Sequence, residues 1–292
     1  MISVCIPVYN YNVIELAKEL SSQAVKASVP VEVVFLDDGS EKSVLDMNRT
    51  VQSFEKVRFY EQKNRGRSAS RNRLAELSKG EYLIFIDADC GVAANFVEKY
   101  ASNLKEDCVL VGGLEYGPRP KEASQVLRWK VGIKREVRSL RNRLKNPYAH
   151  FLTSNFMIPK RIMEIIAFEE MLGGYGHEDT LFGYALQAAK VDIVHIDNPV
   201  IHLGIDDSDL YLFKIEQSID NLIFLLKEDP HRKDFTLLRY YQVLKRMRLT
   251  SLFCWIFKPL DVWITKRLSS KYAPLILLDI YKMRLLIEKM KS

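Results

Sequence analysis

Two aspartates, Asp87 and Asp89, stand one residue apart directly after an apolar segment. Residues 82–86 read Tyr-Leu-Ile-Phe-Ile, a composition that predicts a buried strand. Ionised carboxylates resist burial unless a partner compensates them, so we expect the pair at the exposed end of this strand. Carboxylate oxygens on a short turn suit a hard divalent cation such as Mg²⁺ or Mn²⁺, and such a cation binds phosphates. The pair therefore predicts a metal–diphosphate site.

The first hundred residues predict the sheet that would position this site. Strand patterns at 2–8, 31–36, 57–60 and 82–86 alternate with helical patterns at 13–28, 42–54 and 67–77. This alternation predicts an α/β fold with a mostly parallel sheet and helices on both faces. Ligands on such sheets bind outside the carboxyl ends of the strands. Polar clusters follow three of the strands, at 9–10, 37–40 and 87–89, so we expect them on one rim.

The pattern changes after residue 100. It predicts a strand at 108–117, a basic helix at 122–145, a flexible loop at 173–176, a helix from 178, short strands at 192–196 and 199–203, and helices from 209 onward. A hydrophobic content of 48% and a charged content of 27% fit a soluble globular protein. We find no signal peptide and no apolar run of the ~18–20 residues that spans a bilayer, so we expect a cytoplasmic protein.

The charge distribution and the cysteine content indicate the kind of partner and the cellular compartment to expect. Residues 231–292 hold 14 Lys and Arg against 4 Asp and Glu, a balance of +10, so the rest of the +6 chain sums to −4. Such a tail suggests an anionic partner, either a membrane surface or a nucleic acid. The four cysteines form no CxxC pair, which favours reduced thiols.

The first ~115 residues resemble the inverting family-2 glycosyltransferases, which have a GT-A fold. The resemblance rests on four motifs in the family's order and spacing: Ile6-Pro7-Val8-Tyr9-Asn10, Asp37-Asp38-Gly39-Ser40, Asn64-Arg65-Gly66 with Ser70-Arg71-Asn72, and Gly80-Glu81-Tyr82 leading into Asp87-Ala88-Asp89. It implies a mixed, mostly parallel sheet flanked by helices and a nucleotide-diphosphate sugar as donor, with a UDP-sugar favoured.

The resemblance also implies roles for the motif residues. Pro7 and Tyr9 would form a wall for the base, and Asp38 would accept a hydrogen bond from a uracil N–H. Arg71, on a helix that opens at the rim, would bind the diphosphate. Asp89 would ligate the metal, and Asp87 would contact the ribose or the water shell of the metal. The alternatives are a helix-capping turn at 37–40 and a solvated arginine at 71.

A second motif, Gly174-Tyr175-Gly176-His177-Glu178-Asp179, resembles the Glu-Asp loop of chondroitin-polymerase and β-1,4-galactosyltransferase-like domains. Direct displacement needs a base that deprotonates the acceptor hydroxyl. The resemblance assigns Asp179 as this base and Glu178 as an acceptor-binding neighbour, and it makes His202 a metal ligand. The alternatives are an acidic helix start and a structural histidine.

Two further patterns have competing interpretations. Residues 125–129 fit the QxxRW pattern of processive synthases, but they precede Glu178-Asp179, so we interpret the match as chance. The C-terminal tail mixes aromatic residues with cations, which suits either a membrane interface or a helical cap on the sheet domain. We predict a glycosyltransferase domain at 1–228, with a donor half at 1–115 and an acceptor half at 116–228, and a basic amphipathic helical extension at 229–292.

The sequence thus predicts a metal-dependent inverting hexosyl- or N-acetylhexosaminyl-transferase of polysaccharide biosynthesis. Its acceptor would be a hydroxyl of a glycan or lipid-linked glycan, at or near the inner face of the cell membrane. The alternative is a non-catalytic nucleotide-sugar-binding scaffold subunit of a membrane glycan-assembly complex, which would bind without turnover. A nucleic-acid-binding protein would use the basic helices, but the acidic rim would repel phosphate unless a metal were present, so we expect no nucleic-acid partner. A nucleotidyltransferase would also use paired aspartates and metal, but we find no Gly-rich loop followed by Arg and Lys near the first strand to hold a triphosphate.

Overall fold

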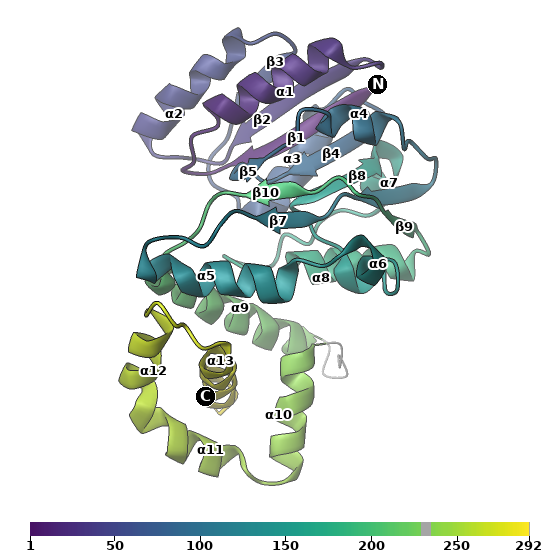
Figure 1. The fold of residues 1–292 in the computed structure, drawn as a ribbon. Helices are drawn as coiled ribbons and strands as arrows, with labels where there is room; N and C mark the ends of the chain where they lie inside the picture. Colours follow the sequence, from purple (N-terminus) through teal and green to yellow (C-terminus); the bar gives the residue numbers. More distant parts are fainter. Residues whose placement is uncertain (229–234, 292) are drawn as a thin grey trace. The chain divides into compact units, whose positions relative to one another are not determined.

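A computed structural model describes residues 1–228 and 235–291 (Figure 1). The chain forms two compact units. The first, here called the sheet unit, comprises Met1–Gly117, Glu136–Met171 and Glu178–Gly204, and the second, the helical unit, comprises Pro118–Arg135, Leu172–His177 and the chain from Ile205 onward. Every residue predicted to act in catalysis, donor binding or metal binding belongs to the sheet unit. The predicted boundary at residue 229 lies outside the described residues.

A seven-stranded sheet in the order β3-β2-β1-β4-β8-β6-β9 forms the centre of the sheet unit. The strands are β1 (Ile2–Val8), β2 (Val31–Asp37), β3 (Val57–Glu61), β4 (Tyr82–Ile86), β6 (Cys108–Val111), β8 (Asn155–Pro159) and β9 (Asp192–His195). Strand β8 runs antiparallel to both of its neighbours, and the other pairs are parallel. The predicted mixed, mostly parallel sheet is therefore confirmed.

Helices cover both faces of this sheet (Figure 1). They are α1 (Ile14–Lys26), α2 (Lys42–Asn48), α3 (Arg67–Leu77), α4 (Phe96–Ala101), α6 (Leu140–Arg143), α7 (Lys160–Ile165) and α8 (Glu178–Ala188). Successive strand residues point to opposite faces. Val4 of β1 packs in the core that includes α1 and α4, whereas Cys5 packs in the core that includes α3 and α8.

A small second sheet lies in the same unit. Strand β10 (Val200–His202) pairs antiparallel with β5 (Cys90–Gly91) and parallel with β7 (Leu114–Tyr116). The prediction of one strand at 108–117 is wrong, because β6 and β7 belong to different sheets. Gly112 and Gly113 separate them: a Cβ at Gly112 would lie 2.3 Å from the Asn198 carbonyl oxygen, and Gly113 has φ +97°, which favours glycine.

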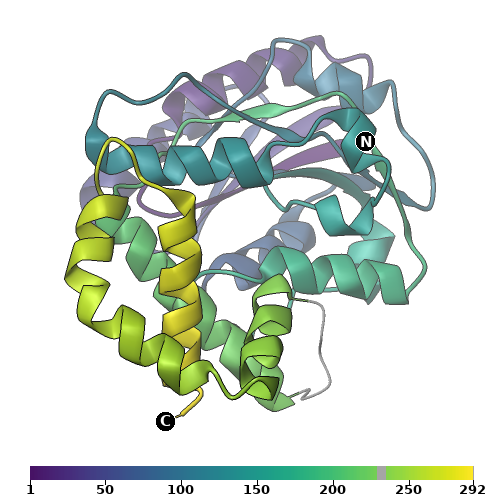
Figure 2. The same ribbon diagram turned by 60° about the horizontal axis from the view of Figure 1, so that its bottom comes forward.

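The helical unit contains α5 (Val126–Val131), α9 (Ser208–Glu228), α10 (Thr236–Arg246), α11 (Thr250–Phe257), α12 (Asp261–Leu268) and α13 (Leu275–Lys289). Helices α10, α11 and α12 lie around α13 (Figures 1 and 2). Leu278 and Leu286 of α13 are fully buried. The single helix predicted at 122–145 is wrong. This segment forms α5, a π-helical turn at Gly132–Glu136 and α6, because the chain passes from one compact unit to the other there. Among the described residues, no helix combines the length and apolarity that crossing a membrane requires.

Candidate active site

The ends of β1 and β2 lie level at one rim of the sheet, because Val8 pairs in register with Asp37. Asp37 is buried, and its Oδ1 accepts hydrogen bonds from the backbone N–H groups of Gly39 (3.1 Å) and Ser40 (2.8 Å). Gly39 has φ +81°, so the sharp turn after β2 depends on glycine. Beside this turn Tyr9 is 56% exposed and Pro7 is partly buried. The predicted wall for a base is therefore open to solvent.

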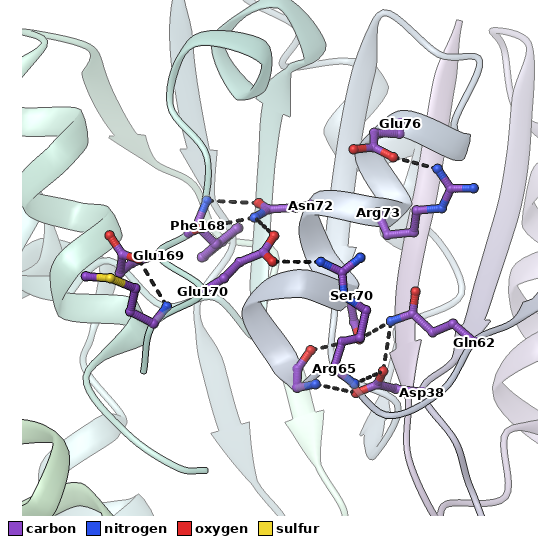
Figure 3. A network of polar contacts seen from close by, with 12 residues as sticks. Asp38, Gln62, Arg65, Ser70, Asn72, Arg73, Glu76, Phe168, Glu169 and Glu170 are labelled. Atoms are coloured by element: carbon purple, nitrogen blue, oxygen red, sulfur yellow. Dashed lines mark hydrogen bonds and ion pairs between the residues drawn. The ribbon is translucent and has the colours of Figure 1, made fainter. Parts of the chain in front are cut away.

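Asp38 holds the loop that leads into α3 (Figure 3). Its Oδ1 accepts from Gln62 Nε2 and from the backbone N–H of Arg65, and its Oδ2 accepts from the backbone N–H of Gly66, each at 2.8 Å. The carboxylate is buried, so these bonds compensate its charge. Three acceptor positions are thus used inside the protein, which gives Asp38 a structural role. Its contact with a uracil ring stays a prediction.

Glu170 ties the start of α3 to the segment after α7 (Figure 3). Its Oε2 accepts from Arg65 Nη2 at 3.0 Å and its Oε1 accepts from Asn72 Nδ2 at 2.8 Å. Asn72 also bonds both backbone groups of Phe168. These contacts occupy Arg65 and Asn72, and they fix the orientation of the helix that carries Arg71.

Arg71 is buried, yet two of its nitrogens have no partner. Its Nη2 donates to Asp87 Oδ1 at 2.7 Å, and its guanidinium carbon lies 5.5 Å from the centre of the Phe168 ring. Nε and Nη1 have no hydrogen-bond partner within the described part of the chain. Buried donors are nearly always satisfied, so this half-paired guanidinium indicates an anionic ligand. The structure therefore brings the predicted residues Arg71 and Asp87 together, and it does not support a solvated arginine.

The small second sheet brings Asp89 and His202 together. Register pairs His202 with Cys90, and the backbone N–H of Leu203 donates to the Asp89 carbonyl oxygen at 2.8 Å. As a result Asp89 Oδ2 lies 3.7 Å from His202 Nε2. The His202 ring stacks on Tyr116 with ring centres 5.1 Å apart. The imidazole is thereby held with one nitrogen toward the carboxylate.

A carboxylate and an imidazole that converge in this way form a donor set that fits Mn²⁺. Gly204 leaves the space that this arrangement needs, because a Cβ there would lie 2.5 Å from Asp89 Oδ2. Within residues 1–228 and 235–291, no group of three or more His, Cys, Asp or Glu side chains is placed to hold a metal. A cation bound to Asp89 and His202 would therefore take its remaining ligands from phosphate oxygens or water.

Asp179 opens helix α8 beside this rim. Its Oδ1 accepts from the Thr153 hydroxyl at 2.5 Å. The pKa of Asp179 is raised from 3.8 to about 7, first by burial and then by the neighbouring Glu178, while the Thr153 bond and Arg71 act to lower it. Asp87 also raises the pKa, so Asp179 lies within electrostatic reach of the Arg71–Asp87 pair. A carboxylate that titrates near neutral pH is suited to act as a general base.

Glu178, the predicted acceptor-binding neighbour, lies 3.7 Å from Arg67 Nη1 at the start of α3. The carboxylate side chain is mostly buried, whereas that of Arg67 is 46% exposed. The structure thus places one arginine of α3 near each member of the Glu-Asp pair. The motifs assigned no role to Arg67, Gln62, Tyr116, Thr153 or Gly204. Thr153 could have been considered from the sequence, because it stands in a polar stretch, Thr153-Ser154-Asn155, directly before the apolar residues of β8 (Asn155–Pro159).

One rim of the sheet unit thus combines a half-paired buried arginine, a carboxylate–imidazole pair and a carboxylate with a raised pKa. The family model Glycosyl transferase family 2 matches residues 3–164, more than half of the chain, so the chain belongs to this family. The resemblance stated from the motifs is therefore confirmed.

Curated relatives match parts of the chain. An uncharacterized glycosyltransferase of Haemophilus influenzae is 27% identical over 43% of this chain and 51% of its own. The poly(ribitol-phosphate) beta-glucosyltransferase of Bacillus spizizenii is 31% identical over 36% of this chain and 17% of its own. The uncharacterized glycosyltransferase YfnE of Bacillus subtilis is 25% identical over 78% of this chain and 62% of its own. The chain thus spans about half or less of the length of several curated relatives.

Solved structures share the fold at low sequence identity. The mannosyltransferase PcManGT of Pyrobaculum calidifontis, in complex with GDP-Man and Mn²⁺, has a TM-score of 0.55 and 14% identity, and the match covers 97% of this chain and 86% of that one. Staphylococcus aureus TarS 1–349 has a TM-score of 0.52 and 18% identity over 99% of this chain and 91% of that one. Both matches confirm a GT-A fold with C-terminal helices.

Proposed function

We propose that the protein transfers one sugar from a nucleotide-diphosphate sugar to a hydroxyl of a glycan or lipid-linked glycan, with inversion at the anomeric carbon. The observation that carries this proposal is Asp179, a carboxylate with a pKa of about 7 beside a half-paired buried arginine. Solved structures of TarS with UDP and with UDP-GlcNAc support a UDP-sugar as the favoured donor. We infer that the sugar is a hexose or an N-acetylhexosamine.

In this mechanism the ionised Asp179 takes the proton of the acceptor hydroxyl, and Thr153 holds the carboxylate in position. The acceptor oxygen attacks the anomeric carbon while the bond to the diphosphate breaks. Glu178 would orient the acceptor, and Arg71, whose Nε and Nη1 have no partner among the described residues, would stabilise the charge that develops on the leaving group. A divalent cation, Mn²⁺ or Mg²⁺, would be held by Asp89 and His202 and would neutralise the leaving diphosphate. Asp87 is paired with Arg71, which leaves Asp89 as the carboxylate for the cation.

The structure also supports a donor base near Pro7 and Tyr9, because these residues lie at the end of β1 beside the Asp37–Ser40 turn. There Tyr9 offers an exposed ring for stacking. Asp38, which fixes the loop before α3, would reach the base with its remaining acceptor position.

Calorimetry of UDP binding, once in the presence of Mn²⁺ and once in EDTA, tests the donor site. Wild type should bind UDP in a metal-dependent manner, and Asp89→Ala should lose this dependence. Asp179→Asn should bind UDP like wild type and lose hydrolysis of UDP-sugars by about 100-fold or more, the usual contribution of a general base. Retained turnover in Asp179→Asn would defeat the mechanism. UDP binding without turnover of any UDP-sugar would favour the non-catalytic scaffold, and failure to bind UDP, GDP or dTDP would remove the donor site.

A further inference from the structure

The outer surface of α11 and α12 is apolar where a surface helix is normally polar. Both helices pack on α13 through buried residues, Cys254 of α11 and Ile264 and Leu268 of α12. Their other sides face solvent (Figure 2). Helix α11 reads Thr-Ser-Leu-Phe-Cys-Trp-Ile-Phe and contains no charged residue. An exposed apolar surface of this kind marks a site of interaction.

Exposed apolar residues continue through α11, the 3-10 turn at Lys258–Leu260 and α12. They are Leu252 (48% exposed), Trp255 (75%), Ile256 (44%), Leu260 (41%), Val262 (67%) and Trp263 (53%). Leu252, Trp255 and Ile256 are three and four positions apart, so they share one side of α11. Together with the cations Lys258, Lys266 and Arg267, the exposed apolar residues of this run are called the tryptophan face below. Two tryptophans that are both more than half exposed and stand so close in the chain are unusual on a surface that meets only water.

Exposed cations interrupt this apolar surface. Lys258 follows Trp255 by three positions, and Lys266 and Arg267 follow Trp263 by three and four, which places each cation beside an indole. Residues 236–271 contain eight Lys and Arg but a single acidic residue, Asp261. Asp261 pairs with the buried Arg284 at 2.6 Å, and although Lys258 contacts Glu288 at 3.2 Å, its side chain stays 70% exposed. The tryptophan face is therefore strongly positive.

We propose that the tryptophan face binds the surface of an anionic lipid bilayer. Indole rings locate at the level of lipid headgroups, and neighbouring lysines and arginines gain ~1 kcal/mol each from anionic lipid. A contact with another protein fits less well, because lysine is depleted in the cores of protein interfaces. Membrane binding through the tryptophan face depends neither on the identity of the sugar nor on turnover. Such binding would bring the protein to the same surface as a lipid-linked acceptor.

Co-sedimentation with vesicles tests the proposal on the full chain. Wild type should bind vesicles in which about a third of the lipid is phosphatidylglycerol, bind pure phosphatidylcholine weakly, and lose binding as salt is raised. Replacement of the three cations by glutamine should lower partitioning on the order of 100-fold. Trp255→Ser with Trp263→Ser should lower partitioning ~10-fold or more on both lipid mixtures.

Ile165→Ser provides a matched control, because Ile165 is 83% exposed but lies in the sheet unit. It should bind vesicles like wild type. Circular dichroism and UDP calorimetry verify that each variant is folded. Absence of wild-type binding to anionic vesicles overturns the proposal, and so does binding that the face variants leave unchanged. Conversion of a wild-type dimer to a monomer by the tryptophan variant would also overturn it, because a second copy of the chain would then cover the face.

Discussion

Replacement of Asp179 by asparagine should stabilise the protein in a pH-dependent manner. The pKa of this carboxyl rises from 3.8 to about 7 on folding, chiefly through burial. A raised carboxyl pKa gives stability that is fully present below pH 3.8 and is lost as the pH rises toward 7. An asparagine side chain at this position cannot titrate but can still accept the Thr153 bond. The stability gained by Asp179→Asn should therefore grow between pH 4 and pH 7 and level off above.

The size of this effect follows from the pKa shift. Between the two pKa values, each pH unit changes the free energy of unfolding by ~1.4 kcal/mol. The two units from pH 5 to pH 7 therefore set an upper limit of about 3 kcal/mol on the increase in the stability gained by Asp179→Asn. The side chain is partly exposed, and solvent screening reduces this figure, so we expect about 1–3 kcal/mol. Such a gain from removal of the proposed base would indicate that Asp179 is kept at a cost in stability.

Urea unfolding at pH 5, 6, 7 and 8 measures the effect, with EDTA and without nucleotide so that ligand binding does not contribute. Circular dichroism should report the transition, since Trp129, Trp255 and Trp263 all belong to the helical unit and their fluorescence does not report on the sheet unit. Asp192→Asn, which changes an exposed carboxylate at the start of β9, is the matched control and should give a constant difference. A constant difference for Asp179→Asn as well would refute the reasoning.

Three further predictions concern the same rim. Thr153→Val should move the acid limb of the kcat/KM profile to higher pH by about half a unit or more, because the lost hydrogen bond favours ionised Asp179. Glu178→Gln should move this limb to lower pH, because Glu178 raises the pKa of Asp179. Thr153→Ser keeps the hydroxyl and should leave the limb in place. Gly204→Ala should weaken Mn²⁺-dependent UDP binding ~10-fold or more, as measured by calorimetry, because the added methyl group displaces the Asp89 carboxylate. The control Gly117→Ala, where a Cβ meets nothing within 4 Å, should bind UDP like wild type. Equal affinities of the two variants would contradict a role of Gly204 in the metal site. Burial raises the pKa of the Cys90 thiol well above 9, so iodoacetamide should label it at pH 8 only after unfolding, as followed by mass spectrometry, and rapid labelling of the native protein would be inconsistent with the structure.

The local sequence pattern determined much of residues 1–115, the predicted donor half. The predicted strand at 82–86 and helix at 67–77 have the bounds of β4 and α3, because each has a strong period and a clear end. The single strand predicted at 108–117 and the single helix predicted at 122–145 failed for a different reason. Apolar and helix-favouring residues continue through both segments, but tertiary packing moves the chain from one sheet or unit to another within each.

The sequence by itself determined the family, the α/β alternation and the types of residue at the rim, since these depend on local periodicity and on motifs whose members lie close in the chain. Tertiary structure alone decided which of them meet. Asp89 and His202 are more than a hundred residues apart and meet through the pairing of β10 with β5. Asp179 acquires a pKa near neutrality from burial and from Glu178, and long-range packing sets that burial. Exposure of the tryptophan face is likewise a tertiary property, because the same residues could equally have packed on α13.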